Sequence, residues 1–274
     1  LSAIMCGSRC IAAPENLDSF LVMRALYNVV QHLEKGGVGM SHGITTVAFD
    51  ADDTLWHNER FFQLTQDHFA SLLSDYTDKP ALMDRLLAAE RRNLGHYGYG
   101  IKGFTLSMIE TAIEVTEGRV PASVIAELMS TGREMLRHPV DLLPHVREAI
   151  EAASTRHKVL LITKGDLLDQ ERKLAQSGLG ELFHGVEIVS DKSATVYAEI
   201  FARHGDGAQR GLMIGNSMRS DVVPMIEAGG WGVFVPHGIE WAIEKADPPT
   251  EHPRFCSIGD LGELPSLLDR ISQD

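Results

Sequence analysis

Short apolar runs recur along the chain and alternate with stretches in which apolar residues repeat at helical spacing. Such runs are typical of buried strands, and their alternation with helices is typical of parallel strands joined by crossover helices. We therefore predict an α/β fold with a three-layer core and a mostly parallel sheet. The predicted strands are Val47–Phe49, Val159–Thr163, Val186–Val189, Gly211–Ile214, Val233–Val235 and, at an edge, Phe255–Ile258.

The alternation is interrupted after the first strand. Residues 59–140 show only helical periodicity, which predicts an all-helical insert and divides the core into 41–58 and 141–274. Residues 1–40 are predicted to be an N-terminal extension containing a helix over Leu17–Leu33. This extension is either a docking helix, and then a candidate contact in a homo-oligomer, or the product of a translation start upstream of Met40; the sequence leaves both open.

Composition argues against several classes of function. The net charge is −13 and no basic stripe is present, whereas nucleic-acid binding needs a dense positive surface. No apolar run reaches the length of a membrane span, and residues 1–14 carry no basic leader. Three cysteines are too few and too scattered for a disulfide framework or a zinc site. We expect a cytoplasmic protein with reduced thiols that binds neither nucleic acid nor membrane.

Polar residues follow the predicted strands in a regular way. Asp50 and Asp52 follow the first strand, Thr163 ends the second, Lys192 follows the third and Gly215–Asp221 follows the fourth. Because the carboxyl ends of parallel strands lie at one edge of a sheet, these residues are expected to meet. Asp50 and Asp52 are two residues apart in extended chain, so we expect both carboxylates to project to the same side.

These residue types suit phosphate chemistry with a hard cation. Asp50, Asp52 and Asp221 offer oxygen ligands of the kind that Mg²⁺ prefers. Thr163 offers a hydroxyl donor, and Lys192 a positive charge suited to phosphate. Each residue taken singly also has an ordinary explanation, such as a strand-end turn or a solvated lysine. Their order at successive strand ends favours the functional interpretation.

In these motifs the chain resembles the haloacid dehalogenase-like hydrolase superfamily. The resemblance rests on Asp50-Ala51-Asp52-Asp53-Thr54, Thr163, Lys192 and the loop Gly215–Asp221, and it covers about residues 44 to 236. It implies a Rossmann-like core, and it implies that the helical insert is the family's cap. Asn216 stands where many relatives have Asp, so Asp221 is expected to be the main metal ligand of its loop.

The resemblance further implies a Mg²⁺-dependent phosphatase that acts on a small phosphorylated molecule. Asp50 would be the nucleophile that forms an aspartyl-phosphate, and Asp52 would be the general acid and base. The Asp50 carboxylate, the Asp52 backbone carbonyl and Asp221 would hold Mg²⁺. The residues implied to bind phosphate oxygens are Thr163, Lys164 through its backbone N–H, and Lys192. Behind them, Thr54 would brace its loop, and Asn216 can hydrogen-bond a ligand carboxylate or a metal-bound water.

Other activities remain open on the same residues. A phosphotransferase or mutase would use the same site and pass the phosphoryl group to a sugar. A 2-haloacid dehalogenase belongs to a branch that needs no Mg²⁺ and lacks an acid equivalent to Asp52. A non-catalytic phosphate-binding regulatory protein is the third alternative. Substrate choice is expected to come from the turn His96–Gly103 of the insert, and Trp56 and His57 are further candidates for substrate contact.

Overall fold

The computed structural model describes residues 43–273, so the predicted N-terminal extension and its helix lie outside the described residues. Within the described part, six strands form one sheet in the order β3-β2-β1-β4-β5-β6, and every neighbouring pair is parallel. This confirms the predicted fold class. The strands are β1 (Thr46–Phe49), β2 (Lys158–Lys164), β3 (Gly185–Val189), β4 (Gly211–Gly215), β5 (Trp231–Phe234) and β6 (Phe255–Ser257).

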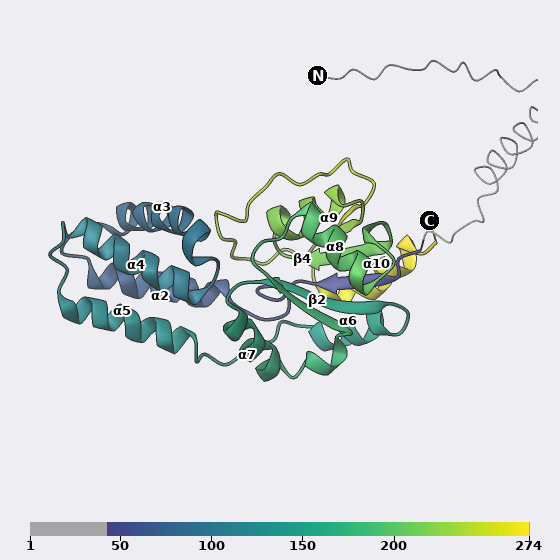
Figure 1. Ribbon diagram of the computed structural model, residues 1–274, viewed down its shortest axis with the longest axis horizontal. Helices are drawn as coiled ribbons and strands as arrows, with labels where there is room; N and C mark the ends of the chain where they lie inside the picture. The colour runs from purple at the N-terminus through teal and green to yellow at the C-terminus, as the bar shows by residue number, and fades with distance from the viewer. Residues whose placement is uncertain (1–42, 274) are drawn as a thin grey trace, which may run out of the picture. The chain divides into compact units, whose positions relative to one another are not determined.

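Helices cover both faces of the sheet and complete three layers (Figure 1). In β1, Val47 and Phe49 belong to an apolar cluster with α6 and α10, whereas Ala48 belongs to a cluster with α8 and α9 on the other face. This division follows from the two-residue period of a strand, and burial on both faces explains why the strands are apolar throughout. The core helices are α6 (Val146–Ser154), α7 (Leu167–Ser177), α8 (Ala194–His204), α9 (Val223–Glu227) and α10 (Leu264–Ile271).

Between β1 and β2 the chain forms a helical insert with an apolar core of its own (Figure 1). Phe69, Leu86, Phe104 and Leu128, one from each of its helices, are buried in this core. The insert and the sheet belong to one compact unit. The helices of the insert are α2 (Glu59–Leu72), α3 (Lys79–Tyr97), α4 (Ile101–Val115) and α5 (Ala122–Met135). No helix within residues 43–273 has both the length and the apolar character needed to cross a bilayer.

One segment beside the strand ends differs from the prediction. The sequence predicts a helix over 221–228 that begins at Asp221, but a π-helical turn, Met218–Val222, precedes α9. The Ser217 hydroxyl caps this turn by accepting a hydrogen bond from the backbone N–H of Ser220 at 2.9 Å. Serine before a helix is a strong start signal, and the prediction placed the start three residues too late. Asp221 therefore lies inside the turn, and π-helical turns occur frequently at functional sites.

Candidate active site

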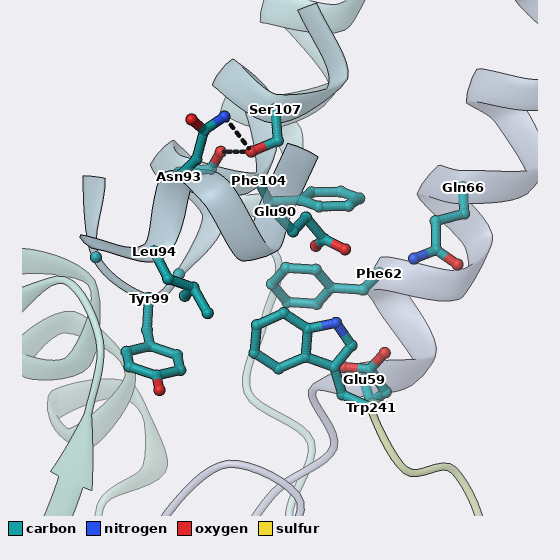
Figure 2. A pocket seen from close by; sticks show the side chains of 13 residues that line it. Glu59, Phe62, Gln66, Glu90, Asn93, Leu94, Tyr99, Phe104, Ser107 and Trp241 are labelled. Atoms are coloured by element: carbon teal, nitrogen blue, oxygen red, sulfur yellow. Dashed lines mark hydrogen bonds between the residues drawn. The ribbon is translucent and has the colours of Figure 1, made fainter. Parts of the chain in front are cut away.

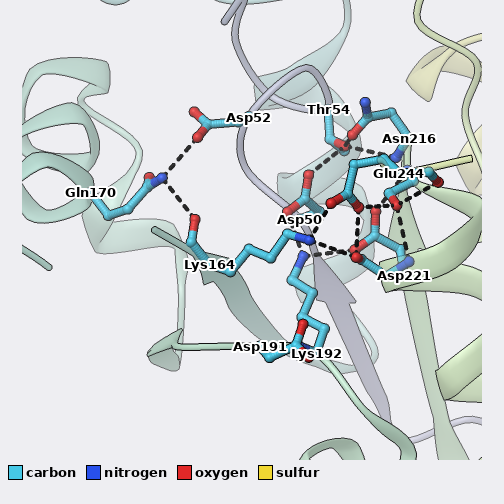
Figure 3. A network of polar contacts seen from close by, with 12 residues as sticks. Asp50, Asp52, Thr54, Lys164, Gln170, Asp191, Lys192, Asn216, Asp221 and Glu244 are labelled. Carbon is cyan, nitrogen blue, oxygen red and sulfur yellow. Dashed lines mark hydrogen bonds and ion pairs between the residues drawn. The ribbon is translucent and has the colours of Figure 1, made fainter. Parts of the chain in front are cut away.

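The carboxyl ends of β1, β2 and β4 and the loop after β3 surround one pocket of about 800 Å³, which we call the strand-end pocket. The structure thus brings together side chains that are far apart in sequence, as the sequence predicts. The candidate residues that line it are Asp50, Asp52, Thr163, Lys164, Lys192, Asn216 and Asp221 (Figure 3). Thr54 does not line the pocket but lies directly behind Asp50. The roles of these residues in a reaction remain predictions.

A buried ion-pair triad lies at the centre of the strand-end pocket. The Lys192 ammonium lies 2.5 Å from Asp50 Oδ1 and 2.7 Å from Asp221 Oδ1. The three residues are 5%, 6% and 1% exposed, in the order Lys192, Asp50, Asp221. The Asp50 backbone N–H donates to the Ile214 carbonyl at 2.8 Å and so continues the pairing of β1 with β4. The nucleophile candidate is therefore fixed by the sheet itself.

The triad carries one more negative charge than positive. Burial raises the pKa of Asp50 to about 7; Lys192 counteracts this rise, and the Asp221 carboxylate adds to it. Burial by itself would lower the pKa of Lys192, but Asp221 and Asp50 outweigh it and raise that pKa. Lys192 therefore remains charged, and the site favours a further positive charge near Asp50.

Neighbouring polar groups fix the two carboxylates of the triad. The Thr54 hydroxyl lies 3.0 Å from Asp50 Oδ2 and accepts a hydrogen bond from the Asn216 backbone N–H at 3.1 Å. The backbone N–H of Ser217 donates to Asp221 Oδ2 at 2.9 Å. A Cβ atom at Gly215 would overlap the Asp221 carboxylate, so only glycine fits at this position. Thr54 thus links Asp50 to the loop after β4 through Asn216.

Asp52 faces a different wall of the pocket from Asp50 (Figure 3). Its carboxylate accepts hydrogen bonds from Trp56 Nε1 at 2.7 Å and Gln170 Nε2 at 2.8 Å, and Lys173 Nζ lies 2.8 Å from Oδ1. Both carboxylates thus line one pocket, as expected, but they contact different partners. The extended strand ends at Phe49, so the alternation of side chains does not continue to Asp52.

Three donors keep Asp52 ionised. Burial by itself would raise the pKa of Asp52, but the charge of Lys173 and the hydrogen bonds from Lys173, Gln170 and Trp56 outweigh it and lower that pKa.

Trp56 is 1% exposed and contacts Asp52, which explains its place after the first strand without any contact to substrate. His57 also lies outside the residues that line the strand-end pocket.

Lys164 is held by groups from three parts of the chain. Its ammonium lies 2.5 Å from Glu244 Oε1 and 2.7 Å from Ser220 Oγ, and it sits 3.9 Å from the centre of the Tyr99 ring. Burial would raise the pKa of Glu244, but Lys164 and the hydroxyls of Ser217 and Ser220 lower it. This network places a second positive charge beside the triad.

The turn between α3 and α4 reaches the strand-end pocket, as predicted for the segment His96–Gly103. Tyr99, Gly100 and Ile101 line the pocket, whereas Tyr97 is 50% exposed. Lys102 forms an ion pair of 2.8 Å with Asp166 in the loop that follows β2. The helical insert thus contributes part of the pocket wall, and its effect on substrate choice remains a prediction.

Several pocket residues had no assignment from the sequence. Gln170 and Lys173 are three residues apart, so they lie on one face of α7, and that spacing could have linked them. Glu244 and Trp241 lie in the irregular segment between β5 and β6, where no periodic pattern exists. Glu59 begins α2 and resembles an ordinary acidic residue in a first helical turn.

The donor set suits one magnesium ion. Asp50 and Asp221 supply two buried carboxylates, and Mg²⁺ is ordinarily bound by one or two carboxylates together with waters and substrate phosphate. Burial is the main reason that the pKa of Asp50 is raised, and the Asp221 carboxylate adds to the rise. Within residues 43–273, no group of three or more His, Cys, Asp or Glu side chains surrounds a common metal position. The fit therefore rests on the two carboxylates, and the Asn216 side chain, which lines the same pocket, offers an amide oxygen.

Comparison with known proteins identifies the family. The family profile described as haloacid dehalogenase-like hydrolase matches residues 44–229. A haloacid dehalogenase-like family hydrolase from Xanthomonas campestris is 42% identical over 84% of this chain and 93% of its own, with a TM-score of 0.76. The chain therefore belongs to the haloacid dehalogenase-like hydrolases. A search of curated proteins found no match.

More distant solved structures share the fold. A putative hydrolase of the same superfamily, YfnB from Bacillus subtilis, crystallised with magnesium, is 18% identical over 83% of this chain and 99% of its own, with a TM-score of 0.59. An L-2-haloacid dehalogenase from Xanthobacter autotrophicus, with chloropropionic acid covalently bound, is 17% identical over 82% of this chain and 98% of its own, with a TM-score of 0.58. The same fold thus occurs in proteins that carry out different reactions, so the activity has to be inferred from the residues of the site.

Proposed function

We propose that the protein is a cytoplasmic Mg²⁺-dependent phosphatase of small-molecule phosphate monoesters. The observation that carries the proposal is the buried Asp50 carboxylate in contact with Lys192, with Lys164 and a second carboxyl, Asp52, in the same pocket. A nucleophile, a proton-transfer group and cations for phosphate oxygens are what this reaction requires. Thr163, 1% exposed at the end of β2, adds a hydroxyl donor.

The residues of the chain suit a two-step reaction. Asp50 attacks phosphorus, the bond from phosphorus to the ester oxygen breaks, and its electron pair goes to the leaving oxygen, which takes a proton from Asp52. Water then attacks the aspartyl-phosphate, gives a proton to Asp52 and releases Asp50. Lys192, Thr163 and the backbone N–H of Lys164 bind the oxygens of the transferred phosphoryl group. When bound at Asp50 and Asp221, Mg²⁺ supplies positive charge that reduces the repulsion between carboxylate and phosphate.

Proton donation requires Asp52 to change partners. Its pKa is lowered in the arrangement described, so the carboxyl is ionised while it contacts Lys173. We infer that the side chain turns from Lys173 toward the leaving oxygen when it carries a proton, and that the contact with Lys173 belongs to its ionised form.

The test of this function is an assay with p-nitrophenyl phosphate. We expect release of phosphate and nitrophenolate in equal amounts with Mg²⁺, loss of activity with EDTA, and recovery when Mg²⁺ is restored. Phosphate release below nitrophenolate release in the presence of a sugar acceptor would favour a phosphotransferase. Chloride release from 2-chloropropionate without Mg²⁺ and no phosphate release would contradict the proposal in favour of a dehalogenase.

A substitution at Lys173 tests the role of Asp52. In Lys173→Met the pKa of Asp52 rises, because the charge that lowers it is removed. Asp52 must be ionised to accept the proton of the attacking water, so we expect the acidic limb of the kcat profile with p-nitrophenyl phosphate to move to higher pH. This substrate has a leaving group that needs no proton, which isolates the base role.

The matched control for this test is Lys79→Met, because Lys79 is an exposed residue of α3 with a surface ion pair to Asp67. Its profile should coincide with that of the unmodified protein. An unchanged acidic limb in Lys173→Met, with the fold intact by circular dichroism, would remove Asp52 from the proposed base step.

A further inference from the structure

A second cavity adjoins the strand-end pocket, which we call the insert cavity. It has about 450 Å³ of empty space, part of it open to solvent, and lies among α2, α3, α4 and Trp241 of the core (Figure 2). Glu59, Tyr99, Gly100 and Trp241 line both spaces. A molecule whose phosphate lies at Lys192 therefore has the insert cavity as a continuation of its own pocket.

The walls of the insert cavity combine aromatic rings with carboxyl groups. Phe62, Phe104, Tyr99 and Trp241 supply the rings; the centres of Phe62 and Phe104 lie 4.9 Å apart, and those of Tyr99 and Trp241 lie 6.1 Å apart. The acidic groups of the lining are Glu59 and Glu90, and its remaining polar side chains are Gln66, Asn93 and Ser107. The lining includes no lysine, arginine or histidine.

Glu90 is the most informative residue of this cavity. It is 8% exposed, it forms no ion pair within residues 43–273, and its carboxyl points into the cavity beside the rings of Phe62 and Trp241 (Figure 2). Burial raises the pKa of Glu90 to about 7, offset in part by a hydrogen bond from Trp241. A buried carboxyl without a cationic partner is unfavourable when ionised, and a bound cation would relieve it.

Glu59 is a second buried acidic residue, and it lies at the junction of the two spaces. Burial raises the pKa of Glu59 to about 8, and the negative charges of Asp53 and Glu90 add to the rise. At the other end, Lys192 and Lys164 supply positive charge. The continuous space thus holds lysine ammonium groups where a phosphate would bind, and carboxyl groups and aromatic rings without a basic side chain where the rest of the molecule would lie.

We propose that the insert cavity binds an alkylammonium group, so that the preferred substrates are phosphate esters of amino alcohols. The ammonium would lie against the face of Trp241, since aromatic faces attract cations, and close to the Glu90 carboxylate. The proposal rests on the phosphatase function proposed above for its catalytic part, whereas the binding of the cation itself does not depend on turnover.

A pair of isosteric esters provides the kinetic test. Choline phosphate and 3,3-dimethylbutyl phosphate have the same shape and differ in the positive charge at one atom. We expect kcat/KM for choline phosphate to exceed that for the neutral ester by on the order of tenfold or more, as a desolvated cation–aromatic contact allows. Glu90→Gln should bring this ratio toward one, because it replaces the carboxylate by a neutral group of the same size.

The matched control is Glu134→Gln, an exposed residue of α5 in the same helical insert, which should keep the ratio of the unmodified protein. A ratio of one or less in the unmodified protein, together with hydrolysis of p-nitrophenyl phosphate, would overturn the inference and leave the phosphatase function standing. Retention of the full ratio in a folded Glu90→Gln would likewise overturn it.

Calorimetry separates the inference from the catalytic proposal. We expect choline to bind more tightly than 3,3-dimethylbutan-1-ol, and expect Glu90→Gln but not Glu134→Gln to remove the difference. If no phosphate ester is hydrolysed, the phosphatase function fails, and this binding result still decides the inference. Equal binding of choline and the neutral alcohol, or no binding of choline, would contradict the cationic pocket.

Discussion

Asp50→Asn should lower kcat by about 10³-fold or more while the protein stays folded. The amide keeps the shape of the carboxylate and the contact with Thr54, but it cannot attack phosphorus and form the covalent intermediate. The measurement is phosphate release from p-nitrophenyl phosphate with Mg²⁺, and circular dichroism reports the fold. Asp75→Asn, at an exposed position, is the matched control and should keep full activity.

The stability of the same variant should depend on pH differently from that of the unmodified protein. The pKa of Asp50 is about 7 in the folded protein and 3.8 for the free side chain. The contribution of Asp50 to the free energy of unfolding is therefore fully present below pH 4 and is lost as the pH rises to about 7. Asn does not titrate and does not show this loss. The melting temperature of Asp50→Asn relative to the unmodified protein should therefore rise between pH 4 and pH 8. A relative melting temperature that falls over this range would contradict the assigned environment of Asp50.

Lys192→Met should destabilise the protein by about 3–5 kcal/mol at pH 8, because it leaves Asp50 and Asp221 buried without their cation. The pKa of Asp50 is then expected to rise further, and the deficit is expected to shrink at pH 5, where the carboxyl takes up a proton. Urea unfolding at the two pH values measures both effects.

Lys245→Met is the control for this prediction, since the Lys245 side chain is 61% exposed and lies 3.9 Å from Glu240. A loss within about 0.5 kcal/mol is expected for such a surface position. If Lys192→Met were equally mild, or equally destabilised at both pH values, Lys192 would not be the charge that balances the two carboxylates. Activity should also fall, because the proposed contact to phosphate is removed.

The location of the site followed from the sequence because parallel strands impose a common direction. Each polar group after a strand had to lie at one edge of the sheet, so the sequence alone groups Asp50, Thr163, Lys192 and Asp221. The identity of the strands followed from their apolar character, which reflects burial on both faces. These two regularities do not depend on the details of side-chain packing.

Side-chain direction in the loops did not follow from the sequence. The chain leaves the strand after Phe49, and the Asp52 carboxylate lies 2.8 Å from Lys173 Nζ, on α7. The distance of α7 from this loop depends on how that helix packs on the sheet, which no local pattern encodes. Trp241 lies in an irregular segment, where neither a strand nor a helix period exists to orient it.

The lining of the insert cavity has a consequence for engineering. Glu90 and Tyr99 belong to the helical insert, whereas Trp241 belongs to the segment after β5 in the core. A chimaera that receives only the helices from this protein would carry the acidic half of the cavity and lose the indole that faces it. Transplanting the recognition properties of this enzyme therefore requires moving two separate pieces of sequence together.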